Sequence, residues 1–327
     1  MTLNRTSALL PSAVEAIGGT PLVELSRFVR QAGVHGRLLA KLEFLNPGFS
    51  KKDRIARQMI EDAEASGLLA PGQTVVELTS GNTGTGLAIV CAVKGYRFVA
   101  VMSRGNSSER ARMMAALGAE VVLVDQAAGS RRGEVSGADL ALVEAATEAI
   151  VRERRAFRAD QFQLDGNVRA HYLHTGPEIL AQAGGPIDGF CDFAGTGGSF
   201  AGCAAAFKAR NPSTRCYIVE PEGAAVLAGG EAVRPGHPIQ GGGYAMRDLR
   251  FLNRAHVDGF VAVGGDEAAD TARTLARVEG LFAGYSSGAN VAAARRLLAG
   301  ELAGATVVVL LNDSGLKYLS TDLWQPR

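Results

Sequence analysis

The feature of this 327-residue chain that most constrains its fold is a repeated alternation of short apolar runs with segments of helical periodicity. Strands are predicted over 75–78, 98–102, 120–124, 190–194, 217–220 and 307–311, and helices over 54–66, 81–93, 108–117, 139–155, 200–210 and 290–299. Strands that alternate with helices form βαβ units, and runs without strict polar alternation suit strands covered on both faces. The sequence therefore predicts an α/β protein with a parallel sheet covered by helices.

Composition and charge restrict the possible partners. The 34 basic and 33 acidic residues give a formal net charge of +1, so the chain lacks the basic surplus that binds nucleic acid or anionic membranes. Residues 1–19 lack the pattern of a secretion signal, and no apolar run reaches the roughly 18 residues of a membrane span. The four cysteines have neither paired nor metal-ligand spacing, which indicates reduced, buried thiols and no metal site: Cys91, Cys191, Cys203 and Cys216. We expect a cytoplasmic protein.

A segment with two lysines precedes the first long helix. Residues 46–54 read Asn-Pro-Gly-Phe-Ser-Lys-Lys-Asp-Arg, with Ser50 as a candidate N-cap. A lysine in the first turn of a helix meets the positive end of the helix dipole, which disfavours its charged form. A lysine whose pKa is lowered is the kind that forms Schiff bases. The segment alone also fits two solvated surface lysines.

Three polar or glycine-rich turns lie where predicted helices begin. Residues 79–84, Thr-Ser-Gly-Asn-Thr-Gly, offer hydroxyls, an amide and backbone N–H groups to a carboxylate. Residues 195–199, Gly-Thr-Gly-Gly-Ser, let a phosphate approach the start of a helix, although they match neither G-x-G-x-x-G nor a Walker loop. Residues 284–289 open the helix over 290–299. Each turn, taken alone, also fits an ordinary capped strand-to-helix connection.

Together and in this order, these segments resemble the fold-type-II pyridoxal-phosphate enzymes, and more closely the cysteine synthase and cystathionine β-synthase group. The similarity runs from Gly-Gly-Thr-Pro-Leu-Val at 18–23 to Tyr-Leu-Ser-Thr at 318–321. It implies a tryptophan synthase β-like α/β fold with two open, mostly parallel twisted sheets covered by helices, the cofactor pyridoxal 5'-phosphate and a homodimer. It also implies two domains, with a boundary near Arg158. Residues 1–46 and 159–327 would form a larger domain that binds the cofactor phosphate, and residues 47–158 a smaller, mobile, substrate-binding domain.

The resemblance assigns cofactor roles to individual residues. The S-x-K element falls on Ser50 and Lys52, so Lys52, not Lys51, is implied to hold the cofactor and to act as the catalytic base. Asn82 is implied to hydrogen-bond the ring hydroxyl, and Ser286 to face the pyridine nitrogen. The implied phosphate ligands are Gly195, Thr196, Gly197, Gly198 and Ser199. A serine opposite the ring nitrogen does not enforce its protonation, which favours loss of a β-leaving group over transamination or racemisation.

The resemblance also implies a substrate site and a reaction. The residues implied to bind the substrate carboxylate are Thr79, Ser80, Gly81 and Thr83, with Gln163 as a looser match. The implied activity is β-elimination and β-replacement on an O-activated L-serine, O-acetylserine or O-phosphoserine, through an α-aminoacrylate. The second partner would be a small nucleophile, with sulfide as the first choice.

Other functions stay open. Within the same chemistry, the nucleophile could be an amine or another thiol, or the enzyme could be a serine or threonine dehydratase that releases a keto acid. A protein of another class, a regulatory nucleotide-binding protein, could use 195–199 for a dinucleotide. That reading leaves Lys52 and Asn82 without a role.

Departures from the family pattern gather around the expected substrate mouth. Leu78, Ser103 and Asn312 stand where the family usually has proline, and the segment 239–249 diverges after Gln240-Gly241, with Tyr244 as one example. They leave the cofactor site intact and both substrates undetermined. Two arginines nearby, Arg104 and Arg247, are either surface residues or ligands of a doubly charged substrate anion.

Overall fold

The computed structural model describes residues 9–130, 135–233 and 236–325, and its strands form two sheets. The larger sheet has the order β1 (Leu22–Glu24), β2 (Arg37–Leu42), β10 (Thr306–Leu311), β7 (Gly189–Phe193), β8 (Arg215–Pro221), β9 (Gly259–Val263). The smaller sheet has the order β5 (Glu120–Val124), β4 (Phe98–Ser103), β3 (Val75–Leu78), β6 (Phe157–Arg158). Every pairing is parallel except that of β1 with β2. The predicted α/β class with two open, mostly parallel sheets is confirmed.

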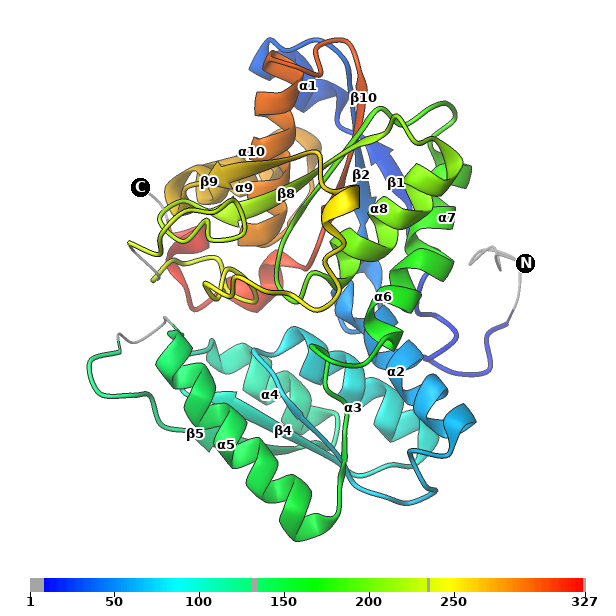
Figure 1. Cartoon of the computed structure of the whole chain (residues 1–327), viewed down its shortest axis with the longest axis vertical. Helices are drawn as coiled ribbons and strands as arrows, with labels where there is room; N and C mark the ends of the chain where they lie inside the picture. The colour runs from blue at the N-terminus through cyan, green and yellow to red at the C-terminus, as the bar shows by residue number, and fades with distance from the viewer. Residues whose placement is uncertain (1–8, 131–134, 234–235, 326–327) are drawn as a thin grey trace.

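Helices cover both faces of each sheet, and each sheet with its helices is called a unit below (Figure 1). In the larger unit they are α1 (Ser26–Ala32), α6 (Gly166–Ala170), α7 (Gly176–Gln182), α8 (Gly198–Arg210), α9 (Gly265–Glu279) and α10 (Tyr285–Ala299). In the smaller unit they are α2 (Lys52–Ser66), α3 (Asn82–Lys94), α4 (Ser108–Ala116) and α5 (Gly137–Arg154). Short 3-10 turns lie at Glu43–Leu45, Arg254–His256, Gly315–Tyr318 and Asp322–Trp324, and a π turn at His171–Thr175. None of the described helices is long and apolar enough to cross a membrane.

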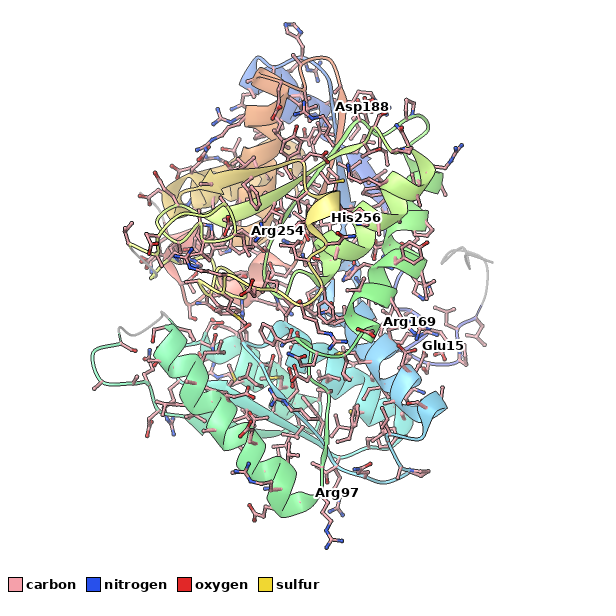
Figure 2. The ribbon with its side chains drawn as sticks, in the orientation of Figure 1. Glu15, Arg97, Arg169, Asp188, Arg254 and His256 are labelled. Atoms are coloured by element: carbon pink, nitrogen blue, oxygen red, sulfur yellow. The ribbon has the colours of Figure 1, made fainter. Side chains whose placement is uncertain are left out.

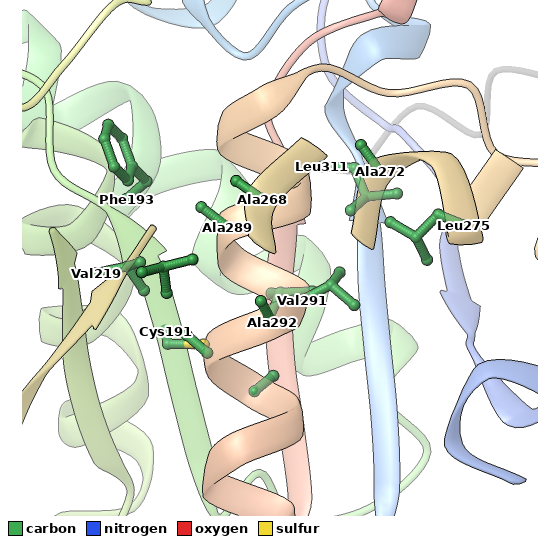
Figure 3. Packing of buried hydrophobic residues seen from close by; sticks show 14 of the residues in the cluster. Cys191, Phe193, Val219, Ala268, Ala272, Leu275, Ala289, Val291, Ala292 and Leu311 are labelled. Atoms are coloured by element: carbon green, nitrogen blue, oxygen red, sulfur yellow. The ribbon is translucent and has the colours of Figure 1, made fainter. Parts of the chain in front are cut away.

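Small side chains let helices pack closely on the larger sheet (Figure 3). Ala289 and Ala292 of α10 are fully buried in the same cluster as Cys191 of β7 and Val219 of β8. A Cβ atom added to Gly288 would collide with the carbonyl oxygen of Ala268 in α9, so only glycine permits this approach of the two helices. The four cysteines are buried free thiols.

The strand directions place the site between the two units. Arg97 immediately precedes β4 and Asp188 immediately precedes β7, and Figure 2 shows these residues at opposite ends of the molecule. The amino ends of the strands therefore point away from the other unit, and their carboxyl ends face each other across the middle. Ligands of open α/β sheets bind at carboxyl ends, so the middle of the molecule is where a site is expected.

Candidate active site

Two adjoining cavities lie between the carboxyl ends of the two sheets. The first, called the lysine cavity, measures about 410 Å³ and is lined by residues that include Lys51, Lys52, Gly195, Thr196, Ser199 and Ser286. The second, called the turn cavity, measures about 530 Å³ and is lined by residues that include Thr79, Ser80, Thr83, Ser103, Gln161 and Tyr244. Four residues border both: Lys52, Asn82, Thr196 and Gly241. The structure thus brings together segments that are more than 200 residues apart.

Lys52 is the first residue of α2 and stands where the two cavities meet. The helix begins two residues earlier than predicted, and its N-cap position is Lys51 and not the predicted Ser50. The backbone N–H of Lys52 donates to Ser50 Oγ at 3.3 Å. Desolvation and, second, the neighbouring charge of Lys51 together lower the pKa of Lys52 to about 7. Among the described residues, none forms a hydrogen bond or ion pair with Lys52 Nζ. This amine is therefore available as a nucleophile and base at neutral pH.

Lys51 has a different environment, although it is adjacent in sequence. Its Nζ lies 2.8 Å from Asp192 Oδ2 and donates to Ser199 Oγ at 2.8 Å. Asp192 is fully buried in β7, and its Oδ1 also accepts a hydrogen bond from Asn290 Nδ2 at 3.0 Å. The Lys51 ammonium group is thus engaged by an ion pair, whereas Lys52 is unpaired. The geometry agrees with the implied choice of Lys52 over Lys51.

Asn82, at the start of α3, is held in one orientation by two charged neighbours. Its Nδ2 donates to Asp313 Oδ2 at 2.8 Å, and its Oδ1 accepts from Lys317 Nζ at 2.8 Å. Tyr318 also donates to Asp313 Oδ2, at 2.8 Å. Lys317 is buried, and desolvation lowers its pKa to about 8. This network fixes the amide of Asn82 at the border of both cavities.

The Thr-Ser-Gly-Asn-Thr turn is stabilised by one of its own side chains. Thr79 Oγ1 accepts hydrogen bonds from the backbone N–H groups of Gly81 and Gly84, both at 2.9 Å. Gly81 has φ +122°, a conformation that L side chains rarely adopt, and a Cβ there would lie 2.5 Å from Arg110. Thr79, Ser80 and Thr83 line the turn cavity, whereas Gly81 shapes the turn. Thr79 therefore has a structural task in addition to its implied one.

The structure does not bring Gln163 to this cavity. Its side chain is exposed and is not among the described residues that line either cavity. Gln161, two residues earlier, lines the turn cavity instead, and its Oε1 accepts from Thr83 Oγ1 at 2.6 Å. Gln161 lies close behind β6, where the chain leaves the smaller sheet at its carboxyl end. The structure therefore places Gln161, and not Gln163, at the turn cavity.

The loop 195–199 is built so that only small residues fit. Gly197 has φ +82°, and a Cβ on Gly198 would collide with the side-chain amide of Asn167. Asn167 Nδ2 donates to Thr196 Oγ1 at 2.8 Å, which fixes the loop against α6. Gly195, Thr196 and Ser199 line the lysine cavity at the start of α8, a helix of 13 residues whose dipole favours an anion there.

Ser286 also lines the lysine cavity, in the first turn of α10. Its Oγ accepts a hydrogen bond from Asn312 Nδ2 at 3.1 Å. Asn312 follows β10 and is one of the positions that depart from the family's usual proline. Asn312 Oδ1 is buried without a partner in the described part of the chain. The pair therefore offers hydroxyl and amide groups to a ligand in this cavity.

The two arginines that could have reached an anionic substrate lie on the surface. Arg104 pairs with Asp125 at 2.8 Å, and its side chain is 56% exposed. Arg247 pairs with Glu231 at 3.0 Å, and its side chain is 51% exposed. Ser103 and Tyr244, also singled out from the sequence, do line the turn cavity. The surface interpretation of both arginines agrees with the structure.

Pyridoxal phosphate fits the residues present. The lysine cavity combines an unpaired amine of lowered pKa, a glycine-rich loop at a helix start, and the serine residue Ser286 in its lining. These are the groups that an aldehyde, a phosphate and a ring nitrogen require. The fold and the site thus define the class of cofactor-dependent enzymes in which a lysine carries the coenzyme.

Comparison with known proteins gives the family. Residues 14–313 match the model of the pyridoxal-phosphate dependent enzyme family, and the chain belongs to it. It is 41% identical over 312 residues to a cysteine synthase of Staphylococcus aureus, covering 95% of this chain and 96% of the relative. It is 40% identical to the O-ureido-L-serine synthase of Streptomyces lavendulae, covering 97% and 93%. The crystal structure of a cysteine synthase from Entamoeba histolytica superimposes with a TM-score of 0.90 at 32% identity, covering 98% of this chain and 93% of that one. The predicted family and cofactor are confirmed.

Proposed function

We propose that this chain catalyses β-replacement on an O-activated L-serine, with Lys52 as both the cofactor-binding lysine and the general base. The observation that carries the proposal is the environment of Lys52, which stands unpaired between the two cavities with a pKa lowered to about 7. A base is most effective when its pKa lies near the working pH, because it can then accept a proton and return it.

The remaining cofactor roles follow from positions in the lysine cavity. When bound, the cofactor supplies an aldehyde and an electron-withdrawing ring that weakens bonds at the substrate's α-carbon. Lys52 Nζ takes the proton from that carbon. We assign the ring hydroxyl to Asn82, which Lys317 and Asp313 hold, and the ring nitrogen to Ser286. The phosphate is assigned to the loop 195–199, which lines the same cavity.

The turn cavity is the proposed site of the amino-acid substrate. Ser80 and Thr83 line it close to Lys52, and Gln161 extends the set through its hydrogen bond with Thr83. Hydroxyl and amide groups at the start of α3 suit a carboxylate, which the helix dipole also favours. We assign the substrate carboxylate to Ser80, Thr83 and Gln161, the last in place of Gln163. Thr79 and Gly81 shape the turn.

The charge of the turn cavity favours an uncharged leaving group. Lys52 is the one cationic side chain among the described residues that line it. A phosphoryl group normally needs arginine or lysine partners, whereas an acetyl group needs only hydrogen-bond donors. We therefore propose O-acetyl-L-serine over O-phospho-L-serine as the first substrate, and sulfide as the nucleophile.

A second nucleophile is favoured by a specific observation. The hydroxyls of Ser103 and Tyr244 and the amide of Asn106 line the turn cavity. These groups can hydrogen-bond a polar, uncharged nucleophile larger than sulfide, and one relative at 40% identity is an O-ureido-L-serine synthase. Hydroxyurea is the nucleophile that would give an O-ureido product from an activated serine.

A substrate screen tests these assignments. The holoenzyme is mixed with O-acetylserine, O-phosphoserine, serine or threonine, and the change in cofactor absorbance is followed. Sulfide, hydroxyurea or a small amine is then added, and the products are identified by mass spectrometry. We expect a lasting spectral change with O-acetylserine and its reversal by the true nucleophile. Release of a keto acid as the main product would instead identify a dehydratase.

The domain boundaries, the oligomeric state and the location of the protein are also proposals. The strands of the smaller sheet all lie within 47–158, and the other strands lie outside this range, which supports the two proposed domains. The homodimer rests on the family resemblance, and the cytoplasmic location on the cysteine spacing and on the lack of a secretion-signal pattern in residues 1–19. Analytical ultracentrifugation of the holoenzyme would contradict the homodimer if it gave the mass of one 34.1 kDa chain.

A further inference from the structure

We infer that Lys51 is an additional cofactor-binding residue, whose ammonium group binds the phosphate of pyridoxal phosphate beside the loop 195–199. The inference rests on the cofactor site proposed above and adds to it a side chain that the family motif does not assign to the phosphate. Its basis is the position of Lys51, the hydrogen-bond partners of Ser199 and the charge balance around Asp192.

Position is the first argument. Lys51 belongs to the segment that starts α2, yet its side chain reaches across to the larger unit and ends beside α8. It lines the lysine cavity together with Gly195, Thr196 and Ser199. Its backbone N–H donates to Asn312 O at 2.9 Å, which anchors the residue at this place. A phosphate held by the loop would therefore lie in the cavity that Lys51 lines.

The hydrogen bonds of Ser199 give the second argument. Ser199 Oγ donates its one hydrogen to Asp192 Oδ2 at 2.5 Å and accepts from Lys51 Nζ at 2.8 Å. A serine hydroxyl has a single hydrogen to donate, so Ser199 can offer a phosphate only its backbone N–H. An ammonium group has three hydrogens, and Lys51 donates two of them to the same carboxylate, Asp192 Oδ1 at 3.0 Å and Oδ2 at 2.8 Å, and one to Ser199. A phosphate oxygen would take the place of one of the two carboxylate contacts, and the other would keep the ion pair. Because the Ser199 hydroxyl donates to Asp192, the side-chain donor for the phosphate is Lys51 and not Ser199.

The charge balance is the third argument. Asp192 is fully buried within reach of the loop that receives the phosphate. The Asp192 carboxylate and a phosphate held by this loop would repel each other strongly in the protein interior unless a cation lay between them. Lys51 is the cation in contact with Asp192, so its ammonium group can bridge the carboxylate and the phosphate. An aspartate in an otherwise apolar strand would be costly without this arrangement.

The experiment measures cofactor affinity and not turnover. Apoenzyme is titrated with pyridoxal phosphate and, separately, with pyridoxal, which lacks the phosphate. Binding is followed by cofactor fluorescence, and the ³¹P NMR shift of the bound cofactor is recorded. The variants are Lys51→Met, Asp192→Asn and the double variant Lys51→Met/Asp192→Asn. The matched control is Lys208→Met, which removes another ion-paired lysine, 2.7 Å from Asp258 at the far end of α8.

The double variant separates phosphate binding from a purely structural role. We expect Lys51→Met to weaken pyridoxal phosphate by about ten- to a hundredfold, the range of a hydrogen bond to a charged group. Pyridoxal should be weakened much less, and only because the pKa of Lys52 rises when the neighbouring charge is removed. The double variant should remain as weak and show a changed ³¹P shift, because the phosphate still lacks its partner. Lys208→Met should bind pyridoxal phosphate with wild-type affinity. Asp192→Asn should bind it with wild-type affinity or more tightly.

Two results would overturn the inference. One is recovery of wild-type affinity in the double variant, since Lys51 would then only neutralise Asp192. The other is an equal loss of pyridoxal and pyridoxal phosphate binding in Lys51→Met, which would indicate damage to the cavity. A wild-type protein that does not attach the cofactor to Lys52 at all would instead refute the proposed function, and the inference with it.

Discussion

At the scale of single residues, the contrast between two adjacent lysines governs the chemistry. Only an unprotonated amine attacks an aldehyde, and the pKa of Lys52 is lowered from its ordinary value to about 7. The rate at which apoenzyme takes up pyridoxal phosphate should therefore rise about tenfold per pH unit below pH 7 and level off above it. Stopped-flow absorbance measures this rate. An inflection near the ordinary lysine pKa would contradict the assignment.

A second prediction at this scale concerns the two nearby glutamines. Gln161 lines the turn cavity and accepts from Thr83, whereas Gln163 is exposed. We expect Gln161→Ala to raise the KM for the amino-acid substrate about tenfold or more, because the carboxylate loses a hydrogen-bonding partner. Gln163→Ala is the matched control and should leave KM unchanged. Steady-state kinetics would refute the new assignment if the effects were reversed.

The sequence predicts the cofactor residues better than those around the substrate. Lys52, Asn82 and the loop 195–199 lie in fixed spacing to helix starts, so a motif places them directly. Gln161 depends on where β6 ends, and a two-residue strand gives little periodicity to read. The sequence gives one indication of the proposed role of Lys51. Asp192 interrupts the apolar run Phe-Cys-Asp-Phe, and a buried carboxylate requires a partner. The identity of that partner, 141 positions away, has no local signal.

At the scale of elements, α2 and α3 pack so closely that a glycine fixes the position of Lys52. A Cβ added to Gly86 in α3 would lie 2.9 Å from the Cα of Asp53 and 3.1 Å from the carbonyl oxygen of Lys52. Gly86→Ala should therefore push the start of α2 outward and lower the free energy of unfolding by about 1–3 kcal/mol. It should also weaken cofactor binding.

The control for this change is Gly137→Ala at the start of α5, where an added Cβ meets nothing within 4 Å. It should change the free energy of unfolding by no more than about 1 kcal/mol, in the stabilising direction. Urea unfolding of both variants gives the comparison. Equal free energies of unfolding for Gly86→Ala and Gly137→Ala would show that α2 can shift without loss of stability, which would contradict the close packing of α2 and α3.

Element types are predicted well from periodicity, and boundaries less well. The strands Val75–Leu78 and Glu120–Val124 have their predicted bounds. The helix predicted to begin at 290 begins at Tyr285, because the Ser-Ser-Gly turn is already helical. Serine and glycine favour caps and turns, so their local propensity does not predict a helix at 285–289. Packing against α9 stabilises the helix there. Residues 126–137 are rich in glycine, serine and arginine, a composition that predicts a loop, and residues 131–134 within them lie outside the described residues.

At the scale of the whole molecule, a buried ionic network joins the two units behind the site. Arg54 of α2 donates to Glu43 at 2.6 Å and to Glu178 of α7 at 2.8 Å, and Lys41 lies 2.7 Å from Glu178. Hydrogen bonding and the charge of Arg54 hold the pKa of Glu178 down to about 2, despite desolvation. The network therefore fixes the start of α2, and with it Lys52, relative to the larger sheet.

This network predicts a pH dependence of stability. Because the pKa of Glu178 is about 2 in the folded protein and 4.5 ordinarily, its contribution is fully present above about pH 4.5 and is lost as the pH falls toward 2. Glu178→Gln should lower the free energy of unfolding by about 3 kcal/mol at pH 7. The difference from wild type should shrink toward pH 3. A difference that is independent of pH would contradict the ionic origin.

The overall division into two sheets is predictable from the sequence, whereas the strand order is not. The last strand, Thr306–Leu311, lies between β2 and β7, with Val308 opposite Leu39 and Phe190. Such pairings join distant segments through packing of the whole unit, and the apolar run that forms β10 would suit any central position. The Arg54–Glu178 contact spans 124 positions and is equally absent from local patterns.

The central claim is that Lys52, and not Lys51, is covalently joined to the cofactor. The most direct measurement is borohydride reduction of the holoenzyme, followed by peptide mapping with tandem mass spectrometry that resolves the two lysines. The account predicts a pyridoxyl group on Lys52 in the wild type and in Lys51→Met, and none in Lys52→Ala. A label on Lys51, or on any other residue of fully loaded protein, would contradict it.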